Sequence, residues 1–512
     1  MRKAGILMPV SSLPSPYGIG TLGAEARKFA DFLAAGGQSC WQLLPVGPTS
    51  YGDSPYQSFS SFAGNPYFID LDILAEWGLL KPEEYQSLDW GSDPAQVDYA
   101  VLYQNRFQVL RLAVSRLSRG DKFEMRGTLW GADWLEDYAL FMALKDKFGG
   151  AAWLEWPKEL RLREPAALEQ VKQELAAEID FWKWVQHLFF SQWWSLKEYV
   201  NKKGISIIGD LPIYVALDSA DVWANPDQFQ LDENGQPTEV AGCPPDGFSE
   251  DGQLWGNPLF NWEKMMEDNY SWWLKRIAWQ FQICDTLRID HFRGFDAYYA
   301  IPYGETTARN GVWKPGPGIA FFKTVNKTLG KKDIIAEDLG FLTPSVKKLL
   351  KDSGYPGMKV LEFAFGNRDE GSDYLPHVYP SRCVVYTGTH DNDTIQGWMA
   401  SASRKEVSFA REYLRLSKRE GYHWGMMRSA WASPASLAVM QFQDLLGLGS
   451  EARMNTPSTL GTNWKWRALP DTYDEKLSKR LYREMRVYQR LPKKSKQPFP
   501  AGDKRTPPKP EQ

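Results

Sequence analysis

Four ionisable side chains lie within six positions of the segment TLRIDHFRG (286–294): Arg288, Asp290, His291 and Arg293. The segment begins as an apolar, β-branched run, which predicts a buried strand. Residues two apart in a strand point to the same face, so Arg288 and Asp290 are expected to lie side by side. A carboxylate and a guanidinium at the end of an apolar strand must either form a structural ion pair or take part in chemistry. For this segment taken alone, a structural ion pair is the simpler interpretation.

Acidic residues end three other short apolar runs of the chain. Asp210 follows ISIIG, Glu337 follows DIIA, and Asp391 ends CVVYTGTHD next to His390. If these strands bring their ends together, the acidic residues form a cluster that costs energy through like-charge repulsion, as functional sites often do. Solvation of the rim of a barrel is the structural alternative.

A cluster of carboxylates could bind a metal ion or act as acid and base. The sequence contains no HExxH motif, no close Cys/His set and only five histidines, although a magnesium site built from carboxylates stays open. Paired carboxylates with an arginine, under loops rich in Trp and Tyr, fit glycoside chemistry better. One carboxylate attacks the anomeric carbon while the other protonates the leaving oxygen, and a covalent glycosyl-enzyme forms. The proton donor must stay protonated near neutral pH, which a neighbouring negative charge promotes.

Eight short apolar runs, separated mostly by helical patterns, predict the scaffold that positions these residues. The runs cover residues 4–10, 40–46, 205–212, 283–289, 333–340, 358–365, 383–391 and 435–442. The first two, joined by a helix predicted over 25–35, form a βαβ unit with parallel strands. Eight such strands predict an α/β fold, a (β/α)8 barrel without a separate C-terminal β-domain, whose catalytic residues lie at the carboxyl ends of the strands.

Two long excursions interrupt the strand pattern. Residues from about 50 to 200 are predicted to be a mainly helical insertion, and residues from about 215 to 260 an irregular loop or lid region. Apolar residues at helical spacing occur at 101–117, 134–148, 165–199 and 263–282. We therefore expect one catalytic barrel over residues 1–491, followed by a flexible Lys- and Pro-rich tail at 492–512.

The composition is that of an ordinary soluble globular protein, with 43% hydrophobic and 24% charged residues among 512. The net charge of −3 gives no sign of a nucleic-acid surface or a polybasic membrane anchor, so neither partner is expected. Aromatic residues make up 14% of the chain and include 23 Trp. They indicate either a heavily aromatic core or stacking platforms for flat ligand faces such as sugar rings.

The cysteines and the N-terminal segment predict a cytoplasmic protein. The four cysteines lie far apart without a CxxC pair, so we expect them to be reduced and mostly buried. The first apolar run ends at Pro9, which is too short for a signal peptide, and no stretch approaches 18 apolar residues.

Five motifs along the chain carry a resemblance to a known family. They are GDSPYQ (52–57), PPDGFSEDGQLWGNP (244–258), TLRIDHFRG (286–294), AEDLG (336–340) and TGTHDNDT (387–394). Together they resemble the motifs of the 4-α-glucanotransferases, which include amylomaltase and the disproportionating enzyme and belong to the α-amylase clan. The similarity extends in order from near Ile6 to about Trp466, and thus over nearly the whole chain.

The resemblance implies a role for each candidate residue. Asp290 would be the nucleophile, Glu337 the general acid/base, and Asp391 would bind sugar hydroxyls and stabilise the transition state. Arg288 would orient Asp290 and hold it ionised. Substrate binding is implied for Arg288, His291, His390, Asp210, Ser54, Tyr56, Gln253, Trp255 and Asn463. The resemblance implies no cofactor and no metal.

The implied reaction is transfer of an α-1,4-glucan segment, with retention, to the 4-hydroxyl of an acceptor glucan or of glucose. The donors would be maltooligosaccharides and amylose. At Asp210 the hydrolases of the clan carry an Asp followed by an Asn-His pair, whereas this chain reads DLPIYV, which suits a transferase. The Gly- and aromatic-rich stretch 243–258 is a candidate lid that excludes water.

Two alternatives to transfer stay open. One is a retaining α-glucan hydrolase of the same clan, and the other is a glucan-binding barrel without catalysis. The intact set of Asp290, Glu337 and Asp391 argues against the second, because binding alone needs no proton donor.

Overall fold

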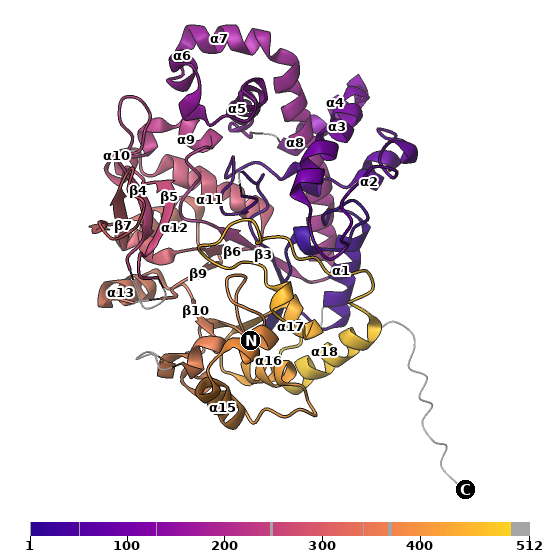
Figure 1. The fold of residues 1–512 in the computed structure, drawn as a ribbon, viewed down its shortest axis with the longest axis vertical. Helices are drawn as coiled ribbons and strands as arrows, with labels where there is room; N and C mark the ends of the chain where they lie inside the picture. The colour runs from indigo at the N-terminus through magenta and orange to yellow at the C-terminus, as the bar shows by residue number, and fades with distance from the viewer. Residues whose placement is uncertain are drawn as a thin grey trace.

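Eight short parallel strands form the central sheet, which curves into an almost closed barrel (Figure 1). In chain order they are β1 (Lys3–Leu7), β2 (Cys40–Gln42), β3 (Ser206–Leu211), β6 (Thr286–Ile289), β9 (Ile334–Ala336), β10 (Gly357–Val360), β11 (Cys383–Tyr386) and β12 (Leu437–Gln441). Each strand pairs with the next and β12 pairs back with β1, except between β9 and β10. There, the Ala336 N–H donates to the Pro356 carbonyl at 3.0 Å. The predicted (β/α)8 barrel is confirmed.

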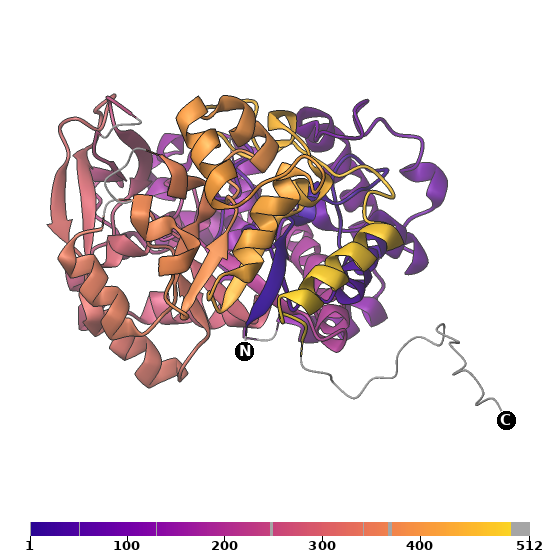
Figure 2. The same ribbon diagram turned by 90° about the horizontal axis from the view of Figure 1, so that it is seen from below.

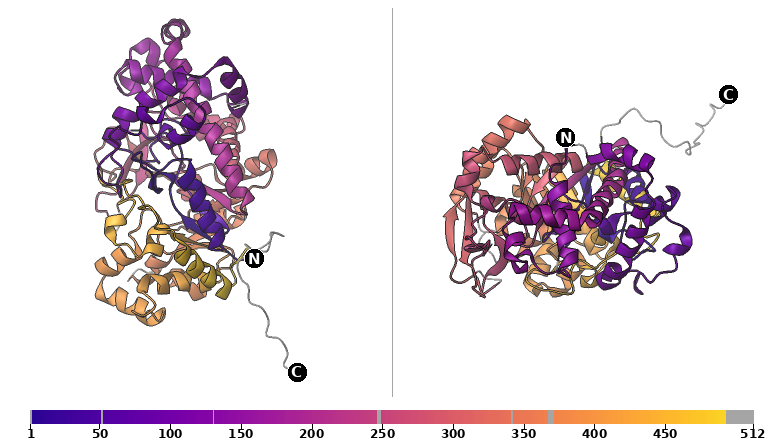
Figure 3. Two further views of the ribbon diagram at one scale, coloured as in Figure 1. Left: turned by 90° about the vertical axis from the view of Figure 1, so that its right-hand side faces the viewer. Right: turned by 90° about the horizontal axis from the view of Figure 1, so that it is seen from above.

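The computed structural model of this chain describes residues 2–50, 52–129, 131–245, 249–340, 342–366 and 371–492. The predicted tail therefore lies outside the described residues except for Pro492. The barrel occupies the middle of the long axis, with the helical insertion at one end and the C-terminal helices at the other (Figures 1 and 3). Strand β1 lies among C-terminal segments (Figure 2), as its pairing with β12 requires.

The barrel strands are buried on both faces, because outer helices cover one face and side chains fill the interior. All residues of β6, β11 and β12 are buried. Close packing requires a glycine at position 209 of β3, where a Cβ would lie 2.8 Å from Cys284 Sγ. Cys40, Cys284 and Cys383 are buried with free thiols and Cys243 is half-buried, so most of the cysteines are buried, as predicted.

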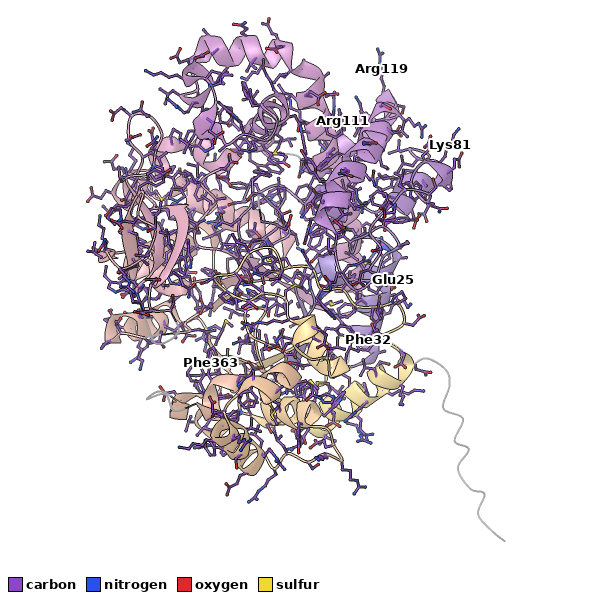
Figure 4. The ribbon with its side chains drawn as sticks, viewed as in Figure 1. Glu25, Phe32, Lys81, Arg111, Arg119 and Phe363 are labelled. Atoms are coloured by element: carbon purple, nitrogen blue, oxygen red, sulfur yellow. The ribbon has the colours of Figure 1, made fainter. Side chains whose placement is uncertain are left out.

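The predicted helical insertion between β2 and β3 is confirmed. It consists of α2 (Leu71–Glu76), α3 (Tyr99–Ser115), α4 (Arg119–Met125), α5 (Leu135–Lys147), α6 (Lys158–Arg161), α7 (Pro165–Glu174) and α8 (Ala176–Lys202). Pro165 occupies the first turn of α7, where its missing N–H costs nothing. Side chains of this insertion such as Lys81 and Arg119 extend from its outer edge (Figure 4). The run 165–199, predicted as one helix, breaks at Leu175.

The remaining helices pack around the barrel. They are α1 (Ala24–Ala35), α9 (Ala220–Ala224), α10 (Trp262–Glu267), α11 (Ser271–Ile283), α12 (Gly318–Leu329), α13 (Pro344–Ser353), α14 (Ile395–Ser401), α15 (Arg404–Tyr413), α16 (Tyr422–Ala432), α17 (Phe442–Leu446) and α18 (Glu475–Val487). Phe32 of α1, labelled in Figure 4, packs against Phe442 and Tyr473 and so ties the N- and C-terminal parts together. In the described part of the chain, no helix combines the length and the apolar character needed to cross a membrane.

The prediction of an irregular region at about 215–260 was wrong in part. This region contains β4 (Glu239–Cys243) and β5 (Gln253–Pro258), which pair with β7 (Ala297–Pro302) and β8 (Val312–Pro315) in an antiparallel sheet of order β5-β4-β7-β8. The strands are short and rich in Gly and Pro, and half of the sheet comes from beyond β6. Local sequence patterns do not reveal such non-local pairing.

Two other segments also differ from the prediction. The helix expected over 263–282 is divided into α10 and α11, because Asn269 and Tyr270 adopt left-handed backbone conformations with φ of 57° and 58°. The strand expected over 358–365 ends at Val360 and continues as a 3₁₀ turn, Leu361–Phe365.

Candidate active site

The guanidinium of Arg288 joins two of the predicted carboxylates. Its Nη1 donates to both carboxylate oxygens of Asp210 at 2.7 Å, and its Nη2 lies 3.0 Å from Asp290 Oδ1. Asp210 and Arg288 are register partners on the adjacent parallel strands β3 and β6, which explains their contact. The expectation that Arg288 and Asp290 share a face is confirmed. One buried cation thus serves two carboxylates, and the trio keeps a net negative charge.

Glu337 reaches the same place from the end of β9. Its Oε2 accepts the His291 main-chain N–H at 2.7 Å, and its Oε1 accepts the Leu339 N–H at 2.7 Å. His291 has φ of 50°, an uncommon left-handed conformation for a residue other than glycine. Its N–H fixes the Glu337 carboxyl one residue along the chain from Asp290.

The two carboxyls differ in their electrostatic surroundings. Burial and the charge of Asp290 raise the pKa of Glu337 to about 7, against the opposing effects of Arg288 and the two main-chain hydrogen bonds. Burial also raises the pKa of Asp290, to about 6, although the Arg288 charge opposes that rise. Among the ion pairs of the described residues, Arg288 contacts Asp290 and none involves Glu337. A proton shared by the pair therefore resides mainly on Glu337.

Asp391, the third predicted catalytic residue, is held ionised at the end of β11. His390 Nε2 lies 3.3 Å from its Oδ2, and the Asn455 side-chain amide donates to its Oδ1 at 2.6 Å. Its partial withdrawal from water favours the neutral form, but His390, Asn455 and Arg288 outweigh this and lower the pKa of Asp391 well below its ordinary value. Asp391 is therefore a fixed negative charge near the Asp290–Glu337 pair.

Tyr56 connects the long loop after β2 to this cluster. Its hydroxyl donates to Asp210 Oδ2 at 2.8 Å, and its ring stacks on His390 with centroids 5.0 Å apart. Trp464 packs against both rings at 5.7 Å and 6.0 Å. The Ser54 hydroxyl accepts the Tyr56 main-chain N–H at 3.2 Å and so contributes to the turn that presents Tyr56.

The antiparallel sheet supplies the residues beside His291. Trp255 of β5 packs edge-on against the His291 ring, with centroids 4.9 Å apart, and donates its indole N–H to Gln253 Oε1 at 3.1 Å. Burial lowers the pKa of His291 to about 3, so the imidazole is neutral. Its buried Nε2 has no hydrogen-bond partner among the described residues. The centre of the candidate lid, residues 246–248, lies outside the described residues.

The side chain of Asn463 has no described hydrogen bond to the carboxylates of the cluster. Its described hydrogen bonds go to Thr456 and Thr459, and they close its own loop. Thr456 follows Asn455, so these hydrogen bonds brace the segment whose Asn455 reaches Asp391.

Asn455 and Arg453 are site residues that sequence reasoning missed. Arg453 donates to the main-chain carbonyls of Asp391 and Asn455, at 2.7 Å and 2.8 Å respectively. Neither residue follows a strand or belongs to one of the five motifs. The signal available in the sequence was their position just before GTNWKW, the segment that contains Asn463.

The described residues contain no group of three or more His, Cys, Asp or Glu side chains arranged to hold a metal ion. The carboxylates of Asp210 and Asp290 could have belonged to such a group, but both contact Arg288 instead. Arg288 thus occupies the position in which a bound cation would neutralise these acids.

Treatment with EDTA followed by gel filtration is expected to leave the enzymatic rate unchanged, because Arg288 already provides the positive charge at Asp210 and Asp290. The check is the initial rate before and after treatment, with and without added Mg²⁺ or Ca²⁺. A rate that falls with EDTA and returns with a divalent ion would contradict this expectation and support the metal-site alternative.

Comparison with known proteins identifies the family of this chain. A sequence model of the 4-alpha-glucanotransferase family matches residues 8–471. The chain is 49% identical to a 4-alpha-glucanotransferase of Clostridium butyricum, over 94% of this chain and 100% of that relative. It is 47% identical to a 4-alpha-glucanotransferase of Thermus thermophilus, over 96% of this chain and 99% of that protein.

Solved structures show the same relationship. An amylomaltase from Streptococcus agalactiae, in complex with acarbose, superposes with a TM-score of 0.94 at 41% identity, covering 96% of this chain and 100% of that one. An amylomaltase from Corynebacterium glutamicum, at 19% identity and a TM-score of 0.74 over 96% of this chain and 74% of its own, shares the fold. This chain belongs to the 4-alpha-glucanotransferase family.

Proposed function

We propose that this protein is a 4-α-glucanotransferase that moves an α-1,4-glucan segment from a donor to the 4-hydroxyl of an acceptor by a retaining double displacement. Donors are maltooligosaccharides and amylose, and acceptors are other glucans and glucose. The observation that carries the proposal is the asymmetry of one carboxyl pair. Asp290 contacts the Arg288 guanidinium, whereas Glu337 accepts only main-chain N–H groups among its described hydrogen bonds.

In the first step Asp290 is the nucleophile. Its carboxylate oxygen bonds to the anomeric carbon while the glycosidic C–O bond breaks, and Glu337 gives its proton to the leaving oxygen. Arg288 holds Asp290 in line for attack. The ionised Asp391 binds hydroxyls of the reacting sugar and stabilises the positive charge that develops on its ring.

In the second step Glu337, now a carboxylate, takes the proton of the acceptor 4-hydroxyl. The acceptor oxygen attacks the anomeric carbon, the bond to Asp290 breaks, and the two inversions give net retention. Water competes with the acceptor, so transfer requires a bound acceptor sugar and a site closed to solvent. We assign acceptor and donor binding to the surrounding side chains of His291, Trp255, Gln253, Tyr56, Ser54 and His390. Asp210 contributes through its bonds to Arg288 and Tyr56, and Asn463 contributes through its loop.

The pH dependence of kcat/KM is expected to be a narrow bell. The rate rises as Asp290 ionises, with a pKa of about 6, and falls as Glu337 loses its proton, with a pKa of about 7. A pH–rate profile on maltotriose checks this expectation. A rate that keeps rising into alkaline pH would remove Glu337 from the role of acid.

Incubation with maltotriose separates transfer from the two alternatives. Products both longer and shorter than maltotriose, together with free glucose, mean transfer. Products that are only shorter mean hydrolysis, and an unchanged substrate means binding without catalysis. We expect products both longer and shorter than maltotriose. A protein that only shortens maltotriose would contradict the proposal.

We further propose that residues 1–491 act as one catalytic unit and that the protein works in the cytoplasm. The buried thiols of Cys40, Cys284 and Cys383 suit a reducing compartment. The cluster draws residues from the ends of β3, β6, β9 and β11 and from the loops after β2 and β12. A variant that ends at position 491 tests the first statement, because it should keep the full rate.

A further inference from the structure

We propose that Asp444 is a positioning residue for Asp391, because its carboxylate holds both ends of the loop that presents Asp391 to the substrate. This loop, residues 387–395, runs from the end of β11 to the start of α14 and carries both His390 and Asp391. The inference rests on the proposed function, since it assigns Asp444 a part in that reaction.

One side chain bridges the loop. Asp444 lies on α17, directly after β12, and is only 1% exposed. Its Oδ2 accepts the Thr387 hydroxyl at 2.8 Å, and its Oδ1 accepts the Ile395 main-chain N–H at 2.8 Å. Thr387 is the first residue of the loop and Ile395 the last, so a single carboxylate sets the separation of the two ends.

Side chains and main chain of Gln441 and Glu362 also pack closely against one side of the loop. The Gln441 side-chain amide donates to the Asp393 carbonyl at 3.2 Å, and the Glu362 N–H donates to the Thr387 carbonyl at 3.2 Å. At Gly388 a Cβ would lie 3.0 Å from Gln441 Nε2 and 3.1 Å from Glu362 Oε1. The loop therefore has little room to move toward these side chains if its ends change.

Displacement of the loop ends reaches Asp391 through a short chain of hydrogen bonds. The Thr389 N–H and hydroxyl both donate to Asn392 Oδ1 at 2.9 Å, and the Asp391 N–H donates to Thr389 Oγ1 at 3.3 Å. Because this turn is internally braced, it moves as a unit when its anchors shift. A misplacement of about 1 Å in a catalytic group costs as much as roughly 10²-fold in rate.

Both described hydrogen bonds to the Asp444 carboxylate come from neutral donors. Burial raises its pKa to about 7 although these two hydrogen bonds favour the ionised form. A buried acid without a cationic partner is costly to the fold, which is expected where the group contributes to function. None of the described side-chain hydrogen bonds of Asp444 goes to a predicted substrate-binding residue, so we expect its effect on the reaction to be transmitted through the loop.

The test compares Asp444→Asn with a matched control. Asp70 has the same kinds of partner: its Oδ2 accepts the Thr21 hydroxyl at 2.5 Å, and its Oδ1 accepts the Ile73 main-chain N–H at 3.0 Å. It is 6% exposed and caps the start of α2 in the helical insertion. Asp444→Asn and Asp70→Asn are each made alone and in an Asp391→Asn background. A maltotriosyl fluoride donor keeps low rates measurable.

Asp444→Asn is expected to lower kcat by roughly 10- to 100-fold with little change in KM, whereas Asp70→Asn affects stability and leaves kcat within about twofold. In the Asp391→Asn background Asp444→Asn should cost at most about threefold more, because residues that act through one another are not additive. If Asp444→Asn fails to fold, Thr387→Val serves in its place, because it removes the hydroxyl that binds Asp444 and keeps the shape of the side chain. Its loss of kcat should be smaller and should depend on Asp391 in the same way.

Full multiplicative loss in the Asp391→Asn background, or no loss of kcat in the single variant, would overturn the positioning role. The proposed function is tested separately by the wild type. A wild type that makes no longer products from maltotriose rejects the function and this inference with it. If the wild type is active and the kcat losses of Asp444→Asn and Asp391→Asn multiply in full, the inference is rejected and the proposed function stands.

Discussion

Replacement of Asp290 by asparagine is expected to reduce transfer from maltotriose by roughly 10⁴- to 10⁶-fold while the protein stays folded. The amide keeps the shape of the side chain but cannot form the ester bond to the anomeric carbon. Two observations predict an intact fold. The Asp290 N–H still donates to the Leu211 carbonyl at 2.9 Å, and Arg288 keeps both contacts to Asp210. Initial rates check the loss of transfer, and thermal unfolding of the same preparation checks that the variant is folded.

The control for this variant is Asp210→Asn, which alters the other partner of Arg288. The Asp210 side chain is fully buried and makes two of the Arg288 contacts, so loss of its charge leaves a buried cation less well paired. Loss of a partner from a buried pair costs about 3–5 kcal/mol of stability. Asp210→Asn should therefore unfold more easily, unlike Asp290→Asn. Substantial transfer by a well-folded Asp290→Asn variant would exclude Asp290 as the nucleophile.

Replacement of Glu337 by glutamine is expected to cost roughly 10²- to 10⁴-fold with maltotriose, the usual contribution of a general acid. The loss should be far smaller for the first step with a glycosyl fluoride donor, because fluoride leaves without being protonated. Azide should then restore the second step, because it attacks without a general base, and the product should be the α-glycosyl azide. Rates with both donors, with and without azide, measure this dependence.

Asp338→Asn is the matched control for Glu337→Gln. Asp338 is the next residue along the chain, is buried, and accepts the Met358 N–H at 2.6 Å, so its role is to hold β10 beside the end of β9. Its replacement should affect both donors equally. Equal losses with both donors for Glu337→Gln would mean that Glu337 also has only a structural role.

Much of the site was predictable because it depends on strand ends. Asp210 and Asp290 lie at the ends of short apolar runs that indicate buried strands, and Arg288 lies within one of these runs. A barrel of parallel strands collects the carboxyl ends of its strands on one side. The contact between Asp210 and Arg288 follows from the register of two neighbouring strands. For these residues the step from sequence to site needed only strand order and the direction of side chains.

Other parts of the site depend on contacts that have no local signal. Glu337 is fixed by a main-chain N–H that is available because His291 adopts a left-handed conformation. Asn455 reaches Asp391 from a segment 64 positions away in the sequence. The sheet that carries Trp255 combines strands from both sides of β6. In each case tertiary packing, and not periodicity or residue type, decides the geometry.

The aromatic residues illustrate the same limit. Composition could not decide between a core and a set of sugar-binding platforms. Trp193, Trp223 and Trp273 are among the fully buried side chains, whereas Trp255 is half-exposed beside His291, where we propose that it binds sugar. Which aromatic side chains face the site is decided by the loops that carry them.

The proposed double displacement requires that Asp290 becomes covalently attached to the glucan and that Glu337 serves both half-reactions. Mass spectrometry of Glu337→Gln after brief reaction with maltotriosyl fluoride tests it most directly, because this donor needs no acid to form the intermediate and the variant lacks the base that removes it. We expect a proteolytic fragment that contains Asp290 to gain the mass of one maltotriosyl group, with fragmentation placing the group on that side chain. An adduct on a different residue, or fluoride release without any adduct, would contradict the account.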